Sequence, residues 1–405
     1  MKYNIPTWFL VFLFLTACNS DDDELLSDAN VIVAFDFMAN DNDTLSENFS
    51  GKIDIKARTV QLELPFGTDL EGLVPRIVIP EEAKISPGSD SPTDFSEPVL
   101  YTVTAANGDS AEYTVVVRNA APTDREVLLT WYQLNPENTL SWDLEDITEN
   151  WEGITVKDGR VSSVSFPEKE MTLVTPLVRH LDSLKSLNLR DNTIQELPEG
   201  LGALKKLEAL NLSSNELRAL PSDLGSLEAL RLLNLRNNQI EALPPTIGSL
   251  EQLMEINLDF NRLEELPVEI GSLDLISLSV YGNRDLTTLP EALGNNIRLM
   301  NLNVGWCNLS SLPNRLEDLI SLVELNASEN QLSEVPEGIG NLTALKRVML
   351  QKNQLIALPD AMGELSSLLV LEIQENNITT LPAALCERIT ENNVVLNKDP
   401  DAQCE

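Results

Sequence analysis

The sequence predicts an all-β sandwich followed by an α/β solenoid of about ten coils, each about 23 residues long. Two observations lead to this prediction. Short apolar runs alternate with polar residues between residues 31 and 118, and a proline then recurs nine times at an interval of 23 residues, from Pro198 to Pro382. With 405 residues, 42% of them hydrophobic, the chain is long enough to bury the cores of both units.

Residues 1–17 have the pattern of a secretory signal. Met1-Lys2 precedes an apolar run from Thr7 to Leu15, which is too short to span a bilayer. The letters LTAC that end this segment resemble the lipobox of bacterial lipoproteins, in which the signal is cut before the cysteine and that cysteine, here Cys18, carries the lipid. An ordinary cleaved signal is the alternative interpretation.

An acidic segment, residues 18–30, follows the signal. Its DDDE run is similar to the tether that sends such lipoproteins to the cell surface in Bacteroidetes, although Ser20 stands where Lys or Gln is frequent. We therefore expect an outer-membrane protein that meets the membrane only through its N-terminal lipid and faces the cell exterior. A periplasmic orientation stays open as the alternative.

Residues 31–120 are expected to form the sandwich, because runs such as VIVAFDF, VQLELP and RIVIP alternate between apolar and polar residues. The clearest hairpin is VLYTVTAANGDSAEYTVVV, for which Asn107-Gly108 predicts a type I′ turn. This stretch resembles the Ig-like or cadherin-like modules near the N-termini of Bacteroidetes surface lipoproteins. The resemblance implies that the domain acts as a spacer.

The 23-residue period indicates a solenoid, since each coil can bury its apolar residues only against its neighbours. The best-formed unit, LEALNLSSNELRALPSDLGSL, resembles the leucine-rich repeat, which implies a right-handed horseshoe over residues 161–385. Stepping back 23 residues from Leu187 and Leu189 reaches Val164 and Phe166, so RVSSVSF is expected to be the strand of a first, degenerate coil.

Both ends of a solenoid need caps. Residues 121–160 are expected to form a helical N-terminal cap, because Thr123 and Glu126 have the spacing of a capping box. The segment is similar to the cap of plant-type leucine-rich repeats but lacks their cysteine pair, so packing must hold it together. At the other end, residues 386–405 are expected to form the C-terminal cap, and Cys386 and Cys404 are expected to form a disulfide in an exported protein.

Counting six residues back from each repeat proline finds a column that is mostly asparagine. In the resembled family this residue is buried and ties its amide to backbone groups in a ladder. The column consists of Asn192, Asn215, Asn238, Asn261, Arg284, Cys307, Asn330, Asn353 and Asn376. Cys307 is therefore predicted to be a ladder residue rather than a nucleophile, and Cys307→Asn to be tolerated or stabilising.

Phe260, Tyr281 and Trp306 are predicted to form one exposed aromatic group on the concave side of the fifth to seventh coils. Phe260 and Trp306 both lie seven residues before a repeat proline, and Tyr281 follows its strand directly in the irregular sixth coil. Exposed clusters of this kind are usually interaction sites; filling of space left by the irregular coil is the alternative. Their predicted partners in a binding surface are Asp259, Arg236, Glu255 and Asn303.

Composition narrows the function. A net charge of −36 repels phosphate backbones, so no nucleic acid is expected. The single histidine, His180, and the lack of catalytic motifs argue against an enzyme, and no cofactor is expected. No metal is expected either, since DNDTLSE at residues 41–47 lacks the glycine and final glutamate of a calcium loop. The leading hypothesis is a monomeric protein or peptide binder; a glycan binder and a purely structural envelope protein are the alternatives.

Overall fold

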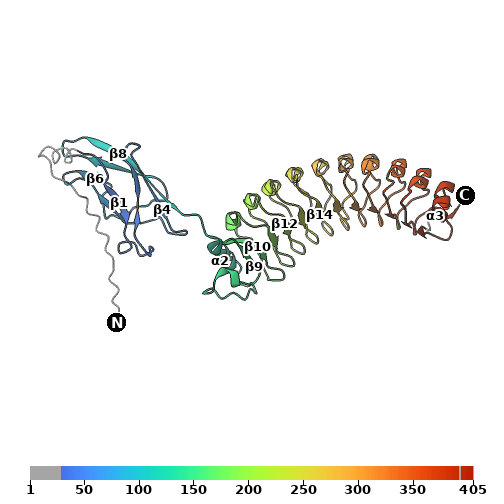
Figure 1. Ribbon diagram of the computed structural model, residues 1–405, viewed down its shortest axis with the longest axis horizontal. Helices are drawn as coiled ribbons and strands as arrows, with labels where there is room; N and C mark the ends of the chain where they lie inside the picture. Colours follow the sequence, from blue (N-terminus) through green and yellow to red (C-terminus); the bar gives the residue numbers. More distant parts are fainter. Residues whose placement is uncertain (1–28, 392–393, 405) are drawn as a thin grey trace. The chain divides into compact units, whose positions relative to one another are not determined.

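A computed structural model describes residues 29–391 and 394–404 of the chain (Figure 1). The predicted signal and the predicted lipid site at Cys18 lie outside the described residues. The described chain divides into two compact units between Ala121 and Pro122. None of the helices in the described part is both long and apolar enough to cross a membrane.

The first unit is made of two β-sheets around one core. One sheet has the strand order β2-β1-β5 and the other β3-β4-β8-β7-β6, with β4 and β8 parallel. The core joins the sheets through rings in edge-to-face contact, since Phe35 on β1 lies 5.7 Å from Tyr101 on β7, measured between ring centroids. The strands are β1 (Ala34–Phe37), β2 (Phe49–Ser50), β3 (Lys52–Asp54), β4 (Thr59–Leu64), β5 (Pro75–Val78), β6 (Lys84–Ser86), β7 (Val99–Thr104) and β8 (Ser110–Asn119).

The hairpin between β7 and β8 has the predicted strands but a different turn. Tyr101 and Tyr113 pair and are buried, as the alternating pattern predicts. The prediction of a type I′ turn is wrong, because only Gly108, with φ 91°, has a positive φ angle in the loop. Its N–H donates to the carbonyl of Ala105, so Asn107 keeps ordinary backbone angles and the glycine alone takes the left-handed position.

The second unit is built on a sheet of 12 strands in the order β21-β19-β18-β17-β16-β15-β14-β13-β12-β11-β10-β9. From β10 to β19 each strand pairs in parallel with the next and supplies one of the ten expected coils. The first coil is as predicted, since Val164 pairs with Leu187. The strands are β9 (Ile154–Lys157), β10 (Arg160–Ser165), β11 (Ser186–Asn188), β12 (Ala209–Asn211), β13 (Leu232–Asn234), β14 (Glu255–Asn257), β15 (Ser277–Ser279), β16 (Asn301–Asn303), β17 (Glu324–Asn326), β18 (Arg347–Met349), β19 (Val370–Glu372) and β21 (Val395–Asn397).

Short 3₁₀ helices lie on the convex side of this unit and the strands on the concave side (Figure 1). The repeat proline explains where most of these helices begin: Pro221, with φ −65°, is the N-cap of η4, and the corresponding prolines cap the later coils. The short helices are η1 (Thr148–Asn150), η2 (Pro176–His180), η3 (Leu201–Ala203), η4 (Ser222–Ser226), η5 (Pro245–Ser249), η6 (Val268–Ser272), η7 (Glu291–Asn295), η8 (Asn314–Asp318), η9 (Glu337–Asn341) and η10 (Asp360–Glu364).

Leucines between strand and helix fill the interior of every coil. In the third coil Leu224, Leu227 and Leu230 are completely buried. Burial of such a side chain contributes about 1.5–3 kcal/mol before the cost of ordering it, so the repeated leucines are the main source of stability.

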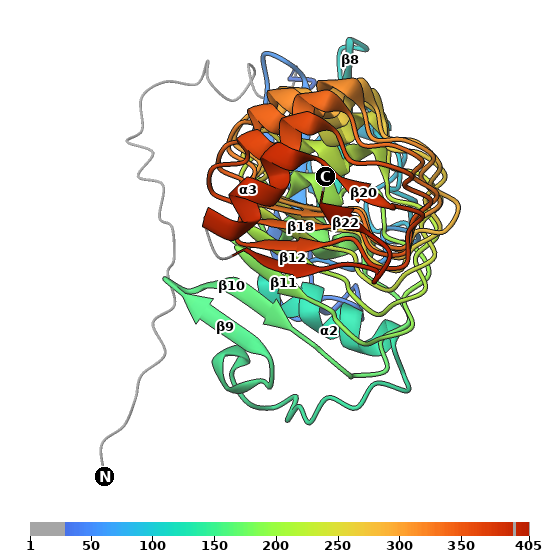
Figure 2. The ribbon, with the colours of Figure 1, turned by 90° about the vertical axis from the view of Figure 1, so that its right-hand side faces the viewer.

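The N-terminal cap is a helix, α2 (Asp124–Leu134), followed by β9, which pairs antiparallel with β10 (Figure 2). The predicted capping box is present, because the Thr123 side chain accepts from the Glu126 N–H and the Glu126 carboxylate accepts from the Thr123 N–H. Buried rings take the place of the missing disulfide. We call them the cap cluster: Trp131, Trp142, Trp151 and Phe166.

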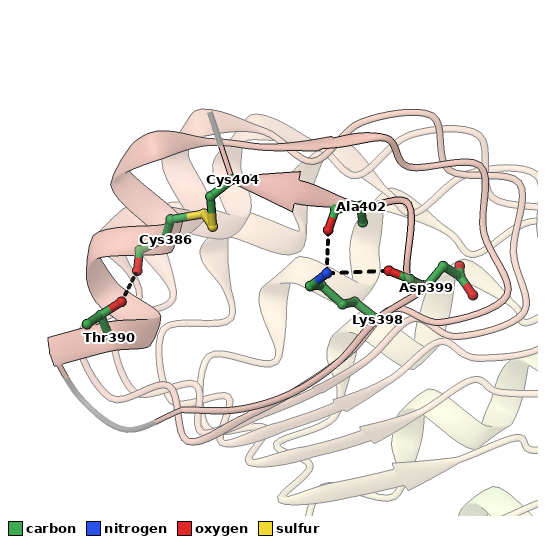
Figure 3. Close-up of a disulfide and its surroundings, with 6 residues drawn as sticks. All are labelled: Cys386, Thr390, Lys398, Asp399, Ala402 and Cys404. Atoms are coloured by element: carbon green, nitrogen blue, oxygen red, sulfur yellow. Dashed lines mark hydrogen bonds between the residues drawn. A yellow bond between two sulfur atoms is a disulfide. The ribbon is translucent and has the colours of Figure 1, made fainter.

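The C-terminal cap is closed by the disulfide between Cys386 and Cys404, whose Cα atoms lie 6.0 Å apart (Figure 3). Cys386 lies on α3 (Ala383–Glu391), and Cys404 lies on β22 (Gln403–Cys404), which pairs with β20 (Thr380–Leu381). Lys398 donates to the carbonyls of Asp399 and Ala402 and so fixes the turn before β22. The cap also adds β21 to the sheet. This eleventh parallel strand has no repeat proline, so the period does not predict it.

Candidate functional site

The asparagine ladder fixes the backbone that carries the candidate site. In a regular coil the Asn215 amide donates to the carbonyls of Leu189 and Leu212, at 2.9 and 3.1 Å, and its oxygen accepts from the Ile194 N–H at 3.0 Å. The residue just before each ladder position has a left-handed φ, for example 55° at Ser214. Each strand therefore ends in the same tight turn, and equivalent side chains of successive turns lie beside one another.

The sixth coil breaks this regularity. Glu255 pairs with Ser277, 22 residues later, and Ser277 pairs with Asn301, 24 residues later, so the coil loses one residue before its strand and gains one after it. The position six residues before Pro290, which Arg284 holds, is therefore not the ladder position of this coil. The buried Asn283 occupies the position, donating to the carbonyl of Val280 at 2.7 Å and accepting from the Leu263 N–H at 3.0 Å.

Three rings meet over this irregular coil, and we call them the ring cluster: Phe260, Tyr281 and Trp306. The centroid of Phe260 lies 5.5 Å from that of Tyr281 and 5.9 Å from that of Trp306, and the remaining pair is 5.8 Å apart. All three side chains are partly exposed. The structure thus brings together three residues that the sequence separates by more than 20 positions.

Their columns differ slightly from the expectation. Phe260 and Trp306 hold the left-handed position of their turns, with φ 53° and 51°, but the same position in the sixth coil belongs to Gly282, with φ 77°. Tyr281 lies one residue earlier. Gly282 makes room for the cluster, because a Cβ atom there would meet Phe260 at 3.0 Å and Trp306 at 3.1 Å, and Gly305 does the same for Tyr281, also at 3.0 Å.

The polar atoms of the ring cluster are free for a ligand. Among the described residues, neither the Trp306 indole N–H nor the Tyr281 hydroxyl has a hydrogen-bond partner. Partial burial raises the pKa of Tyr281, and the charge of Glu329 raises it further, so the hydroxyl keeps its proton at neutral pH. The cluster therefore presents apolar faces together with two unused hydrogen-bond donors.

Asp259 supports the ring cluster from beneath. Its buried carboxylate accepts from the Tyr281 N–H at 3.0 Å and from the Ser279 hydroxyl, and it pairs with Arg236 at 3.1 Å. The Arg236 guanidinium in turn lies over the Phe260 ring, 4.6 Å from its centroid. Of the predicted binding residues, Asp259 is therefore committed to internal contacts, whereas Arg236 forms one border of the exposed surface.

Arg284 forms the opposite border. Its guanidinium lies 3.9 Å from the centroid of the Trp306 ring. Sequence reasoning missed this residue as part of the site because the count back from Pro290 puts it in the asparagine column. The signal that could have found it is the extra residue between the strand and Pro290, which moves Arg284 out of the ladder position.

A shallow groove of about 480 Å³ runs along the concave strands β11 to β15 and ends beside the ring cluster. Asparagines line one row of it, and the exposed Leu232 and Glu255 lie in the next row. Asn303 lies outside the groove on β16, half-buried, two residues before Gly305. The structure thus places the predicted Glu255 in the groove and Asn303 next to the cluster, without a direct contact between the two.

Cys307 is buried in its ladder position. Its Sγ lies 3.3 Å from the Val280 carbonyl, and burial raises the pKa of the thiol to about 11, so it is protonated at neutral pH. A protonated, enclosed thiol is a poor nucleophile. Across the part of the chain that the structure describes, no group of three or more His, Cys, Asp or Glu residues is placed to hold a metal ion.

Comparison with known families gives two matches. The family described as "SGBP, N-terminal", which is associated with Bacteroidetes, matches residues 40–117, and leucine-rich repeat families match residues 182–240 and 321–342. The second unit therefore has the fold of a leucine-rich repeat solenoid, and the first unit is similar to the SGBP N-terminal family over residues 40–117. A search of curated proteins finds no match to this chain.

Solved structures similar to the chain share the repeat fold. A leucine-rich repeat protein of Leptospira interrogans is 32% identical, with a TM-score of 0.52, over 60% of this chain and 60% of that one. The Arabidopsis receptor kinase HAESA, in complex with the peptide hormone IDA and the co-receptor SERK1, is 26% identical, with a TM-score of 0.58, over 69% of this chain and 54% of the receptor. This chain thus spans about 54–60% of the length of these two structures.

Proposed function

We propose that this chain is a lipid-anchored binding protein of the outer-membrane surface, whose repeat unit binds a protein or peptide at the ring cluster. The observation that carries the proposal is the partial exposure of three contacting rings, with an indole N–H and a phenol hydroxyl that no group of the described residues binds. Aromatic side chains of this kind dominate the binding energy of protein interfaces, since they bury a large area at little entropic cost.

The repeat fold supports a ligand of this class. The HAESA structure, whose fold this chain shares at 26% identity, contains a bound peptide hormone. In this chain the groove leading to the ring cluster offers side-chain amides to an extended backbone. The similarity supports the scaffold and the kind of ligand, and it does not extend to the hormone itself or to the residues that bind it.

A glycan is the second candidate, and the match of residues 40–117 to the SGBP N-terminal family favours it. That family suggests a role at the cell surface and glycan binding. Stacked aromatic rings beside amide and guanidinium groups suit a sugar as well, because each sugar ring has an apolar face and an edge of hydroxyl groups.

A binding experiment tests the site. The chain with Cys18→Ser, which is not lipidated, is screened against peptide and glycan arrays, and the affinity for each hit is measured by calorimetry. Trp306→Ala should cost at least about 1–2 kcal/mol of binding free energy, as central aromatic anchors commonly do. Ile356→Ala, a change of an exposed apolar side chain that lines neither the groove nor the ring cluster, serves as the control. Hits that bind the Trp306→Ala variant as tightly as the parent would show that the ring cluster is not the site.

The anchor requires a separate test, since it rests on the LTAC sequence and lies outside the described residues. Mass spectrometry of the mature chain should find Cys18 at the N-terminus with a lipid attached; a free, unacylated N-terminus would rule this out. Protease added to whole cells should cut the protein if it faces outward. Survival of the protein, while a known surface protein is cut, would indicate a periplasmic orientation.

A further inference from the structure

We propose that the ligand of the ring cluster is a carboxylated glycan, an oligosaccharide with uronic acid units, and that Arg284 binds its carboxylate. This inference rests on the second candidate of the proposed function, a glycan bound at the ring cluster, and names that glycan more closely. It combines the sugar-binding character of the rings with a guanidinium that no carboxylate of the described residues neutralises.

Arg284 is held in place by stacking, while the N–H groups of its guanidinium have no partner among the described residues. Its guanidinium stacks on the Trp306 ring, 3.9 Å from the centroid, and the side chain is exposed. Within the described residues it makes no ion pair and no hydrogen bond, even with Asp285, which follows it. A stacked guanidinium keeps its N–H edge free, and that edge has the geometry to bind a carboxylate through two parallel hydrogen bonds.

Arg236, at the other border of the ring cluster, differs from Arg284 because its charge is paired within the protein. It also stacks on a ring, that of Phe260, but its guanidinium pairs with the buried Asp259 at 3.1 Å. The two borders of the ring cluster therefore differ, since one positive charge is neutralised internally and the other is not. The chain has a net charge of −36, so most of its surface repels an anion. An unpaired guanidinium fixed beside three partly exposed rings gives this site a positive charge that an anion can meet.

Two observations favour a glycan over an acidic peptide. Residues 40–117 match the SGBP N-terminal family. In addition, the free donors are an indole N–H and a phenol hydroxyl at the borders of the rings, which suit the hydroxyl groups around a sugar ring that lies on an aromatic face.

Matched ligands test the carboxylate. The probes are a panel of uronic acid oligosaccharides, each paired with its carboxyl-reduced form, which keeps the sugar ring but replaces the carboxylate with a neutral hydroxymethyl group. The full chain with Cys18→Ser is titrated by calorimetry. At least one acidic member should bind, and its reduced form should bind at least about tenfold more weakly, the effect expected from losing a charged hydrogen-bonded pair.

Matched variants test the arginine. Arg284→Gln should weaken binding of the acidic glycan about tenfold or more, to the level of the reduced form, and should leave the affinity for the reduced form unchanged. Arg284→Lys should recover only part of the loss, because an ammonium group cannot bind the carboxylate in the same two-bonded way. Arg262→Gln is the control: Arg262 follows Asn261 as Arg284 follows Asn283, is likewise exposed, and contacts none of the rings.

The outcomes separate the two proposals. Equal binding of the acidic and reduced forms, an Arg284→Gln variant that binds the acidic form as the parent does, or failure of the whole panel to bind would overturn the carboxylate inference. A peptide from the array whose binding depends on Trp306 would also overturn it while leaving the proposed site intact. Binding of an acidic glycan that Trp306→Ala does not change would contradict the proposed site itself.

Discussion

The repeat unit contains two groups of aromatic side chains, and they differ in burial and in the hydrogen bonds of their polar atoms. In the cap cluster Trp131, Trp142 and Trp151 are at most 9% exposed, and each indole N–H donates to a backbone carbonyl at 2.8–3.0 Å. In the ring cluster Trp306 is partly exposed and its indole N–H has no partner among the described residues.

The difference shows how one residue type serves two purposes. A buried tryptophan must satisfy its N–H inside the protein, and the cap cluster does so three times. The tryptophans of the cap cluster therefore have neither an exposed ring face nor a free N–H to offer a ligand. The ring cluster leaves its donors to solvent and rests on two glycines, so its side chains add little to the interior and remain available to a ligand.

The largest expected effect comes from the cap cluster. Trp142→Ala removes a ring that stacks on Trp151 with centroids 4.4 Å apart, and it leaves a cavity beside Phe166. It should lower the free energy of unfolding by about 3–5 kcal/mol, whereas Trp306→Ala should lower it by less than about 1 kcal/mol. Denaturant unfolding of both variants measures the contrast. Similar losses in the two would show that the ring cluster belongs to the structural core.

The disulfide should have the next largest effect. It closes a loop with a sequence separation of 18 and holds the cap over the last coil, so Cys386→Ser together with Cys404→Ser should cost about 3 kcal/mol of stability. Reducing agent should lower the melting temperature of the parent but not of this variant. Peptide mapping without reduction should find the two cysteines linked; free thiols at both positions would refute the pairing.

The period of the sequence is enough to predict the coils, the first degenerate strand and the positions of the ring cluster. The period no longer locates the ladder residue where a coil loses or gains a residue, as around β15, where the spacing is 22 and then 24 residues. The residue added after β15 puts Asn283 in the ladder position, and a count made only backwards from Pro290 reaches Arg284 instead. The stacking of Arg284 on Trp306 depends on how side chains of neighbouring coils pack, which the count does not describe.

Turns and caps show a second limit. Asn-Gly is compatible with more than one tight turn, and the loop after β7 uses the one with a single left-handed residue, Gly108. Likewise β21 has no repeat proline to mark it; it forms because the last coil offers an unpaired strand edge. In both cases the neighbouring strands decide the local structure.

Replacement of Gly282, which lies against the ring cluster, should have a smaller effect on stability, and Gly159 offers a matched control. Gly282 has φ 77° and lies against two rings, whereas Gly159, in the turn between β9 and β10, has φ 74° and open space for at least 4 Å around the place where a Cβ atom would lie. Replacement by alanine should cost both sites about 1–2 kcal/mol for the left-handed backbone. Only Gly282→Ala should also shift the fluorescence of Trp306, measured as the difference from the Trp306→Phe background, and weaken ligand binding. If Gly159→Ala shifted the fluorescence of Trp306 by the same amount, contact between Gly282 and the rings could not be the cause of the shift.

The smallest effect concerns Cys307, and here the structure changes the expectation from the sequence. A ladder asparagine in a regular coil uses its oxygen to accept from a backbone N–H of the preceding coil, as Asn330 accepts from Leu309 at 2.9 Å. At Cys307 the equivalent donor is the Leu286 N–H, which instead binds the carbonyl of Asn283 at 3.1 Å, because the added residue lengthens that turn.

Cysteine fits this position since it requires no donor for an amide oxygen. Cys307→Asn would gain bonds from its amide N–H groups but leave its oxygen buried without a partner, so we expect a loss of about 1 kcal/mol rather than a gain. Deletion of Asp285, the residue that the regular coils lack, should return the Leu286 N–H to the ladder. The two changes together should therefore be more stable than the sum of the separate effects, by about 1–2 kcal/mol, measured in a double-mutant cycle of denaturant unfolding. Strictly additive effects would mean that the added residue and the missing asparagine are unrelated.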